Sequence, residues 1–317
     1  MDVMQKFDEE RRLVSLEIQK TLIGKPERLY VAARHLCLAG GKMVRPVLCI
    51  LSCRAVGGRT EQAVNTGAAI ELMHTFTLIH DDIMDNDDMR RGKPSVHKLY
   101  GLPTAILAGD LLYSKAFELC DPKTVHILSK ATSEICEGQD LDMSFEERTD
   151  VSEADYMEMI AKKTAVLLKA AAESGAVIGG ASEKQAKALA TYGLNLGLAF
   201  QMQDDILGLT ADEEKLGKPV GSDIVEGKKS LIAIRSIETL PSAEKKELLK
   251  ILRKKGNSES EIKRAVNLFH ESGAIEYCKK KAGEYVKNAK DSLEALPKTE
   301  ARDDMYRIAD YVIKREL

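Results

Sequence analysis

Five aspartates fall within eight residues of the chain: Asp81, Asp82, Asp85, Asp87 and Asp88. If this stretch is helical, Asp81 and Asp85 lie one turn apart on the same face. Carboxylates at that spacing repel each other unless a cation neutralises them. Ligands that are all oxygen suit hard cations, and Mg²⁺ in particular bridges carboxylates to substrate phosphates. The run therefore predicts a magnesium site, with a solvated acidic helix end as the alternative.

Other charged residues extend this prediction to a diphosphate. Arg90 and Arg91 follow the aspartates, and their planar guanidinium groups suit phosphate oxygens. A second pair, Asp204 and Asp205, follows a long apolar helical pattern. Two such helix-borne pairs, facing each other across a bundle, would make a cavity for several Mg²⁺ ions. The glycine-rich loop that follows adds Lys218, Asp223 and Lys228.

The segment GGKMVRP, residues 40–46, is a second candidate anion site. Its two glycines let the backbone approach an anion closely. Lys42 and Arg45 lie at the beginning of a helix that Pro46 can start, where N–H groups and the helix dipole favour anions. An ordinary turn with two solvated cations explains the segment equally well.

Three more polar residues have competing explanations. His74 lies two turns before Asp81, but a single histidine there is more often a satisfied core residue. Lys163 enters an apolar run, where a lysine either meets an anion or extends to solvent. Asp142, near the end of a helical pattern, can reach a metal, although a polar helix end is the preferred interpretation.

Periodicity of 3.6 residues recurs along most of the chain and predicts an all-α protein. No convincing strand alternation of five or more residues occurs. The tail from residue 242 is rich in Lys and Glu and predicts an outer layer of amphipathic helices. The other expected helices cover residues 3–22, 27–39, 47–56, 64–85, 103–119, 122–144, 152–180 and 183–209.

Composition limits the possible classes of protein. The chain has 317 residues, of which 44% are hydrophobic and 31% charged, as in globular proteins. A net charge of −3 gives no argument for nucleic-acid binding. No apolar run reaches the eighteen residues of a membrane span, and the N-terminus lacks the pattern of a signal or transit peptide. The six scattered cysteines indicate reduced thiols, so we expect a cytoplasmic protein without disulfides.

Six motifs occur in an order that resembles the trans-prenyltransferases, the short-chain isoprenyl diphosphate synthases. They read GGKMVRP, HTFTLIHDDIMDNDDMRRGKP, GDLLYSKAFEL, KKTAVLLKAAAESGA, GLAFQMQDDILGL and GKPVGSDIVEGKKS. The resemblance implies a single all-α domain over residues 1–317, with a motif-bearing core at about 20–235 and an outer layer at about 242–317. It also implies a large helical bundle around a deep central cavity and a homodimer. The implied reaction joins dimethylallyl, geranyl or farnesyl diphosphate to isopentenyl diphosphate and releases pyrophosphate.

The resemblance also assigns roles to individual residues. Two or three Mg²⁺ ions would be held by Asp81, Asp82, Asp85, Asp204 and Asp205, with Asp223 as a further candidate. The allylic diphosphate would meet Arg90, Lys163, Lys218 and Lys228, and Thr164 and Gln201 would line the reacting centre. Isopentenyl diphosphate would be bound by Lys42, Arg45, His74 and Arg91. The expected catalytic set is Asp81, Asp82, Asp85, Lys163, Thr164, Gln201 and Asp204.

Two positions depart from the family pattern. Met43 stands where many relatives carry arginine, which removes one cation from the isopentenyl diphosphate side. Gly208 replaces a third aspartate in the second acidic motif, which leaves Asp204 and Asp205. A class I terpene cyclase and a non-catalytic partner subunit are remote alternatives, because both aspartate pairs and the isopentenyl diphosphate residues are kept.

The residues just before Asp81 predict the length of the product. Phe76 is a bulky candidate for the floor of the cavity, Thr77 beside it is small, and Met73 lies one turn deeper. A single aromatic residue in a motif without insertion resembles archaeal-type geranylgeranyl diphosphate synthases, which make a C20 product. A farnesyl (C15) or a bifunctional C15/C20 synthase is the alternative.

Overall fold

The computed structural model describes residues 3–148, 150–210, 221–254 and 256–314, without the side chains of residues 147, 210, 222 and 223. The chain divides into two compact units, and each is assembled from separated segments. Unit 1 comprises residues 1–132, 167–193 and 292–308, and unit 2 comprises residues 133–166, 194–291 and 309–317. The single domain expected from the sequence stays a prediction.

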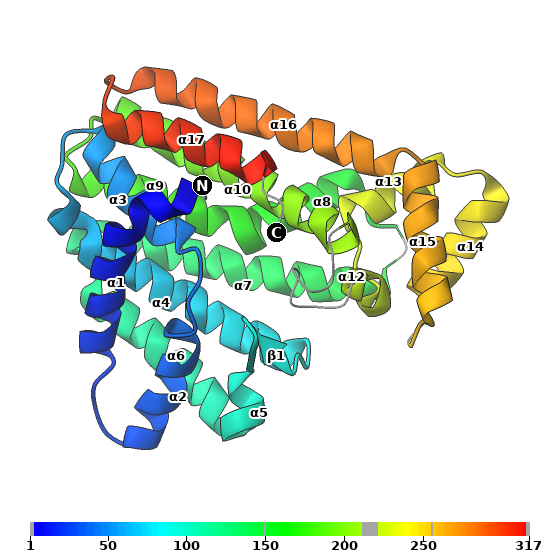
Figure 1. Ribbon diagram of the computed structural model, residues 1–317, viewed down its shortest axis with the longest axis horizontal. Coiled ribbons are helices and arrows are strands. Elements are labelled where there is room, and N and C mark those ends of the chain that lie inside the picture. Colours follow the sequence, from blue (N-terminus) through cyan, green and yellow to red (C-terminus); the bar gives the residue numbers. More distant parts are fainter. Residues whose placement is uncertain (1–2, 149, 211–220, 255, 315–317) are drawn as a thin grey trace. The chain divides into compact units, whose positions relative to one another are not determined.

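Unit 1 is built around the long helix α4, Thr60–Met84, which is buried along most of its length. The helices α3 (Val44–Ala55) and α6 (Leu102–Leu119) pack against α4, and α2 (Glu27–Cys37) packs against α6 (Figure 1). Hydrophobic side chains cover nearly the whole surface of α3, so this helix lies inside the core. The other helices that lie wholly in this unit are η1 (Val3–Phe7), α1 (Asp8–Thr21), α5 (Val96–Tyr100), η2 (Pro122–Thr124) and η4 (Leu293–Ala295).

A short hairpin follows α4. Its strands β1 (Met89–Arg90) and β2 (Lys93–Pro94) pair antiparallel, with Arg90 opposite Lys93. Arg91 and Gly92 form the turn, with φ angles of 53° and 70°. Positive φ at both turn residues is typical of the type I′ hairpin, which matches the natural twist of two strands. The sequence predicted only a loop here, because two-residue strands are too short to show alternation.

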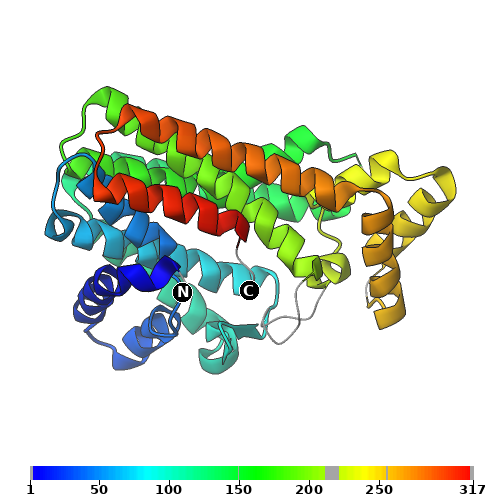
Figure 2. The ribbon, with the colours of Figure 1, turned by 45° about the horizontal axis from the view of Figure 1, so that its top comes forward.

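Unit 2 has a separate hydrophobic core, formed by helices from both before and after the second aspartate pair. Its large buried side chains include Tyr156, Met202 and Phe269. Helices α14 (Ser242–Leu252) and α15 (Glu259–Glu271) contact each other and lie side by side in both views (Figures 1 and 2). The elements are α8 (Glu153–Ile160), η3 (Ala161–Ala165), α12 (Ser222–Glu226), α13 (Leu231–Thr239), α14 (Ser242–Leu252), α15 (Glu259–Glu271) and α16 (Ala274–Ser292).

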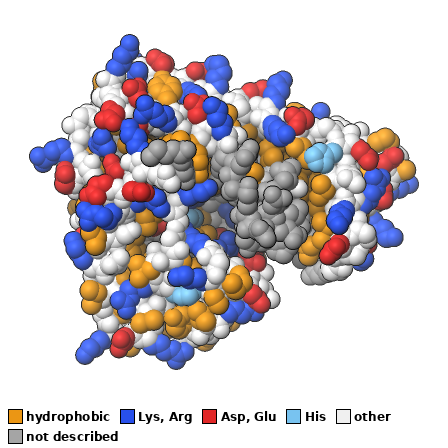
Figure 3. Space-filling model, viewed as in Figure 1, with side chains coloured by type: hydrophobic (Ala, Val, Ile, Leu, Met, Phe, Trp, Pro, Cys, Tyr) orange, Lys and Arg blue, Asp and Glu red, His pale blue; other side chains and the backbone are white. Residues whose placement is uncertain are grey.

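Several helices contribute residues to both units. They are α7 (Val125–Glu147), α9 (Val166–Ile178), α10 (Glu183–Thr210), α16 and α17 (Glu300–Lys314). Within the described ranges, no helix is long and apolar enough to cross a membrane. All six cysteines are described, and none forms a disulfide. On the face drawn in Figure 3, basic and acidic side chains are interspersed rather than gathered by sign.

Most predicted helices are confirmed, and two details are corrected. Ser152 begins α8 as expected: its Oγ accepts from the Asp155 N–H, and Asp155 Oδ2 accepts from the Ser152 N–H. The predicted helix over 152–180 is interrupted by the π-helical turn η3. The predicted helix start at Pro46 is wrong, because α3 begins at Val44. Pro46 is tolerated there, since the first turn of a helix needs no donor from it.

Candidate functional site

The first acidic motif lies at the C-terminal end of α4 in unit 1. The Asp85 N–H donates to Asp81 O at 2.8 Å, so one helical turn separates these two partly exposed side chains. Asp82 is fully buried, and its Oδ1 accepts from Arg90 Nε at 2.6 Å. Arg90 Nη2 also donates to Asp87 Oδ2 at 3.2 Å. The motif thus divides into a solvent-facing pair and an aspartate that is held by an arginine.

A second contact in unit 1 joins Arg45 of α3 to His74 of α4. Arg45 Nη1 lies 3.1 Å from His74 Nε2. Burial, followed by the positive charges of Arg45, Arg91 and Arg90, lowers the pKa of His74 well below its ordinary value. Both residues were predicted to belong to one anion site, and the fold brings them into contact.

Arg91 makes several contacts within unit 1. Its Nη1 donates to Gly40 O at 2.7 Å and to Leu36 O at 3.3 Å, and its Nη2 lies 3.6 Å from Glu71 Oε1. Glu71 is buried, and burial raises the pKa of its carboxyl group, while the charges of Arg91 and Arg45 oppose that shift. Sequence reasoning missed Glu71, because a single acidic residue inside an apolar helix gives no signal of its partner.

The segment GGKMVRP connects α2 to α3 through unusual backbone. Gly40 has φ 85°, Gly41 has φ 148°, and Met43 adopts the left-handed conformation at φ 47°, ψ 39°. The Lys42 side chain is exposed, whereas Met43 is buried. The Met43 side chain is therefore turned into the core.

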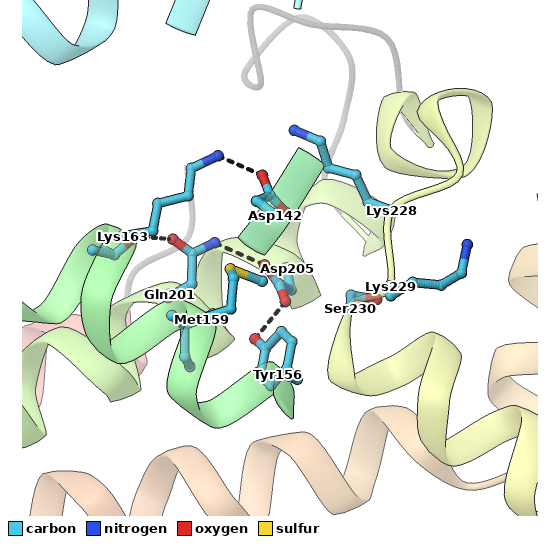
Figure 4. A pocket seen from close by; sticks show the side chains of 11 residues that line it. Asp142, Tyr156, Met159, Lys163, Gln201, Asp205, Lys228, Lys229 and Ser230 are labelled. Carbon is cyan, nitrogen blue, oxygen red and sulfur yellow. Dashed lines mark hydrogen bonds and ion pairs between the residues drawn. The ribbon is translucent and has the colours of Figure 1, made fainter. Parts of the chain in front are cut away.

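Unit 2 contains an open pocket. Five predicted site residues line it: Lys163, Thr164, Gln201, Asp205 and Lys228 (Figure 4). The remaining lining residues are Asp142, Tyr156, Met159, Ile160, Lys229 and Ser230.

A continuous hydrogen-bond network fixes one wall of this pocket. Thr164 Oγ1 donates to Gln201 Oε1 at 2.8 Å, and Gln201 Nε2 donates to Asp205 Oδ1 at 2.9 Å. Tyr156 OH donates to Asp205 Oδ2 at 2.7 Å, so both carboxylate oxygens are used (Figure 4). A fully satisfied polar network is rigid and orients its members. Tyr156 was missed because an aromatic residue on an amphipathic helix resembles ordinary core.

Lys163 and Thr164 lie on the π-helical turn η3, and such turns frequently occur at functional sites. Two glycines of neighbouring helices let the turn pack closely. A Cβ on Gly138 would lie 2.3 Å from Lys163 N, and a Cβ on Gly197 would lie 2.5 Å from Ala165 Cα. Lys163 Nζ donates to Asp142 Oδ2 at 2.5 Å, so Asp142 takes part in the pocket.

The two lysines after α12 have different environments. Lys228 Nζ pairs with Glu226 at 3.0 Å and lines the pocket. Lys229 is buried, donates to Gly227 O and Glu146 O, and its ammonium points away from Asp205 (Figure 4). Burial lowers the pKa of Lys229. Of these two lysines, Lys228 is the one expected at a diphosphate, and that role stays a prediction.

An aromatic layer lies beneath the first acidic motif in unit 1. The ring centroid of Phe76 lies 5.3 Å from that of Tyr113 and 5.4 Å from that of His80. The ring of Phe117 packs against Tyr113 and continues the layer. Thr77 Oγ1 donates to its own helix, at His74 O. The α6 residue Tyr113 was not among the predicted residues.

A sequence profile described as polyprenyl synthetase matches residues 26–269. The chain belongs to the polyprenyl synthetase family. It is 46% identical over 303 residues to the geranylgeranyl diphosphate synthase of Methanosarcina mazei, covering 93% of this chain and 92% of that protein. It is 40% identical over 339 residues to the geranylfarnesyl diphosphate synthase of Natronomonas pharaonis, covering 97% of this chain and 96% of that protein.

The crystal structure of geranylgeranyl pyrophosphate synthetase from Pyrococcus horikoshii matches with a TM-score of 0.94 and 43% identity, covering 99% of this chain and 98% of that one. This similarity and the helical elements confirm the predicted all-α fold of the polyprenyl synthetase family. The resemblance that the six motifs indicated is confirmed as well.

Some predicted site residues are not brought together by either unit. Lys218 and the side chain of Asp223 lie outside the described residues. Asp204 is partly buried on α10 but does not line the pocket that contains its neighbour Asp205. In the part of the chain that the structure describes, no three His, Cys, Asp or Glu side chains are close enough to hold a metal by themselves.

Proposed function

We propose that this member of the polyprenyl synthetase family condenses allylic diphosphates with isopentenyl diphosphate and makes mainly geranylgeranyl diphosphate. The observation that carries the proposal is the pocket of unit 2. Two lysines that can neutralise a diphosphate, Lys163 and Lys228, share it with the fixed pair Thr164 and Gln201. The relatives that carry this product in their names support the same reaction.

The charges of the pocket suit the ionisation of an allylic diphosphate. Breaking the C–O bond leaves negative charge on the departing pyrophosphate, and cations aimed at that charge lower the barrier. Lys163 uses one of its three ammonium donors on Asp142, so two remain for phosphate oxygens. Thr164 and Gln201 would line the reacting carbon in an orientation set by Asp205 and Tyr156.

The donor set of the first acidic motif fits magnesium. Asp81 and Asp85 offer oxygen ligands one turn apart, and Mg²⁺ characteristically takes one or two carboxylates, several waters and substrate phosphates. Such a site needs no cluster of three protein ligands. Asp204, Asp205 and Asp223 are the further proposed ligands, with two or three ions in all. Bound Mg²⁺ would neutralise charge that develops on the leaving pyrophosphate.

Asp82 would act differently from Asp81 and Asp85 in this proposal. Its burial and its contact with Arg90 suit a residue that holds the arginine toward the allylic diphosphate.

Isopentenyl diphosphate would be bound in unit 1 by Lys42, Arg45 and Arg91, with His74 as the partner that orients Arg45. Its double bond would attack the allylic cation, and a proton must then leave. We assign that proton to the released pyrophosphate. The allylic cation requires an environment poor in water, because water would quench it.

A C20 product is the finer part of the proposal. Phe76 is bulky, nearly buried and in contact with Tyr113, which suits a floor that stops elongation. Met73 lies one turn deeper, with its sulfur 4.0 Å from the Thr132 hydroxyl. A C15 product and the C25 product of the Natronomonas relative are the competing outcomes. The homodimer and the cytoplasmic location stay predictions.

The deciding experiment incubates the purified chain with Mg²⁺, isopentenyl diphosphate and, separately, C5, C10 and C15 allylic diphosphates. We expect longer diphosphates that end at C20. A hydrocarbon product would instead indicate a cyclase, and no product from any starter would indicate a partner subunit.

A further inference from the structure

The loop between α2 and α3 is held by arginines from two other elements of unit 1. Gly40 O accepts from Arg91 Nη1 at 2.7 Å, and Gly41 O accepts from Arg11 Nη2 at 3.0 Å. Arg11 lies on α1, thirty positions before Gly41. Successive carbonyls of the loop are therefore fixed by two guanidinium groups.

The loop needs such support because its backbone is strained. Met43 is not a glycine but has a φ of 47°, and left-handed backbone of this kind persists only where the surroundings enforce it. Helix α1 makes a second contact here, since Ser15 Oγ donates to Met43 Sδ at 3.8 Å. Arg11 and Ser15 thus hold the residues on both sides of Lys42.

The neighbouring arginine on α1 has a different environment. Arg11 is oriented by Asp8, whose Oδ1 lies 2.8 Å from Arg11 Nη1, and its side chain is 30% exposed. Arg12 pairs with both carboxylate oxygens of Glu9, and its side chain is 58% exposed. Arg11 and Arg12 line the same shallow hollow beside Gly40 and Gly41. Of these two arginines, Arg11 is the one that donates a hydrogen bond to the loop.

We propose that Arg11 is a positioning residue for isopentenyl diphosphate, which makes α1 part of that site. This inference rests on the proposed function. By holding the Gly41 carbonyl, Arg11 fixes the backbone that presents the Lys42 ammonium and begins the helix that carries Arg45. Loss of this contact lets the loop relax, so the affinity for isopentenyl diphosphate falls while the allylic side is unaffected.

The test is steady-state kinetics on the full chain, with each substrate varied at saturating levels of the other. We expect Arg11→Gln to raise the KM for isopentenyl diphosphate about tenfold, since a charge-assisted hydrogen bond is lost. The KM for the allylic diphosphate and kcat should stay within about twofold. Arg11→Lys should recover part of the loss, and the matched control Arg12→Gln should behave like the unchanged protein.

A thermal-shift titration with isopentenyl diphosphate supplies a readout that needs no turnover. We expect Arg11→Gln to require about ten times more ligand for the same stabilisation. Equal titration curves for Arg11→Gln and the unchanged protein would overturn the inference. A variant in which kcat falls and the KM values for both substrates rise would overturn it as well. Absence of turnover in the unchanged protein would instead count against the proposed function.

Discussion

Arg45 Nη1 and His74 Nε2 lie 3.1 Å apart, and this contact determines which ring nitrogen of the histidine carries the proton. A guanidinium only donates hydrogen bonds, so Nε2 must accept and the ring proton must sit on Nδ1. The lowered pKa of His74 agrees with a neutral ring. His74 thus orients the Arg45 cation without adding a charge of its own.

The neutral His74 predicts a pH-dependent stability. An unfolded histidine titrates near pH 6.5, and the folded pKa lies well below that value. Below pH 6.5 the unfolded state binds a proton that the folded state does not, so the free energy of unfolding decreases as the pH is lowered. Between pH 7.5 and 5.5 the protein should lose about 1.4 kcal/mol relative to His74→Gln, which keeps an acceptor but cannot titrate.

Urea unfolding across this pH range measures the difference between the two proteins. His270→Gln, a change at an exposed histidine, is the control and should follow the unchanged protein. Parallel curves for His74→Gln and the unchanged protein would contradict a neutral His74.

The first acidic motif predicts a specific metal dependence. Asp85→Asn removes one of the two partly exposed carboxylates at the end of α4. Activity should then fall about 100-fold, and half-maximal activity should need about ten times more Mg²⁺. Asp88→Asn is the matched control, because Asp88 is exposed and pairs with Lys98 at 2.7 Å. Removal of Mg²⁺ with EDTA should abolish turnover, and identical Mg²⁺ titrations for the two variants would refute the role of Asp85.

Local sequence patterns were sufficient for most of the helices and for the family that the motifs indicate. Periodicity placed α10 within one residue, and the Ser152–Asp155 pair marked the start of α8, because both signals depend on near neighbours. The contact between Arg45 and His74 agrees with the family resemblance, which implied that both residues belong to one anion site.

Contacts between distant residues could not be predicted in the same way. The hydrogen bond from Tyr156 to Asp205 spans 49 positions, and that from Arg91 to Gly40 spans 51. Nothing in the residues around Tyr156 distinguishes it from core. The π-helical turn at Lys163 depends on close packing at Gly138 and Gly197, which periodicity does not report.

That packing makes η3 sensitive to a single methyl group. Gly197→Ala would place a Cβ 2.5 Å from Ala165 Cα, in backbone that cannot move freely. The free energy of unfolding should fall by about 2 kcal/mol, as for other overpacked cores. Synthase activity should fall as well, because the displaced turn carries Lys163 and Thr164.

The urea unfolding and the activity of Gly197→Ala are compared with those of Gly283→Ala on α16, where an added Cβ meets no atom within 4 Å. The control should be neutral or slightly more stable, because alanine favours a helix over glycine. Equal stability of the Gly197 and Gly283 variants would show that η3 tolerates the methyl group.

The contact between Phe76 and Tyr113 predicts how product length depends on side-chain volume. Phe76→Leu and Phe76→Ala progressively shorten the side chain that we propose as the floor, so the main product should lengthen from C20, most with alanine. Thr77→Val is the control: it removes the hydroxyl that donates to His74 O but keeps the volume, so C20 should remain the main product. Mass analysis of the dephosphorylated products measures all three variants. A C20 product from Phe76→Ala would exclude Phe76 as the floor, whereas longer products from Thr77→Val would show that polarity, rather than volume, limits elongation.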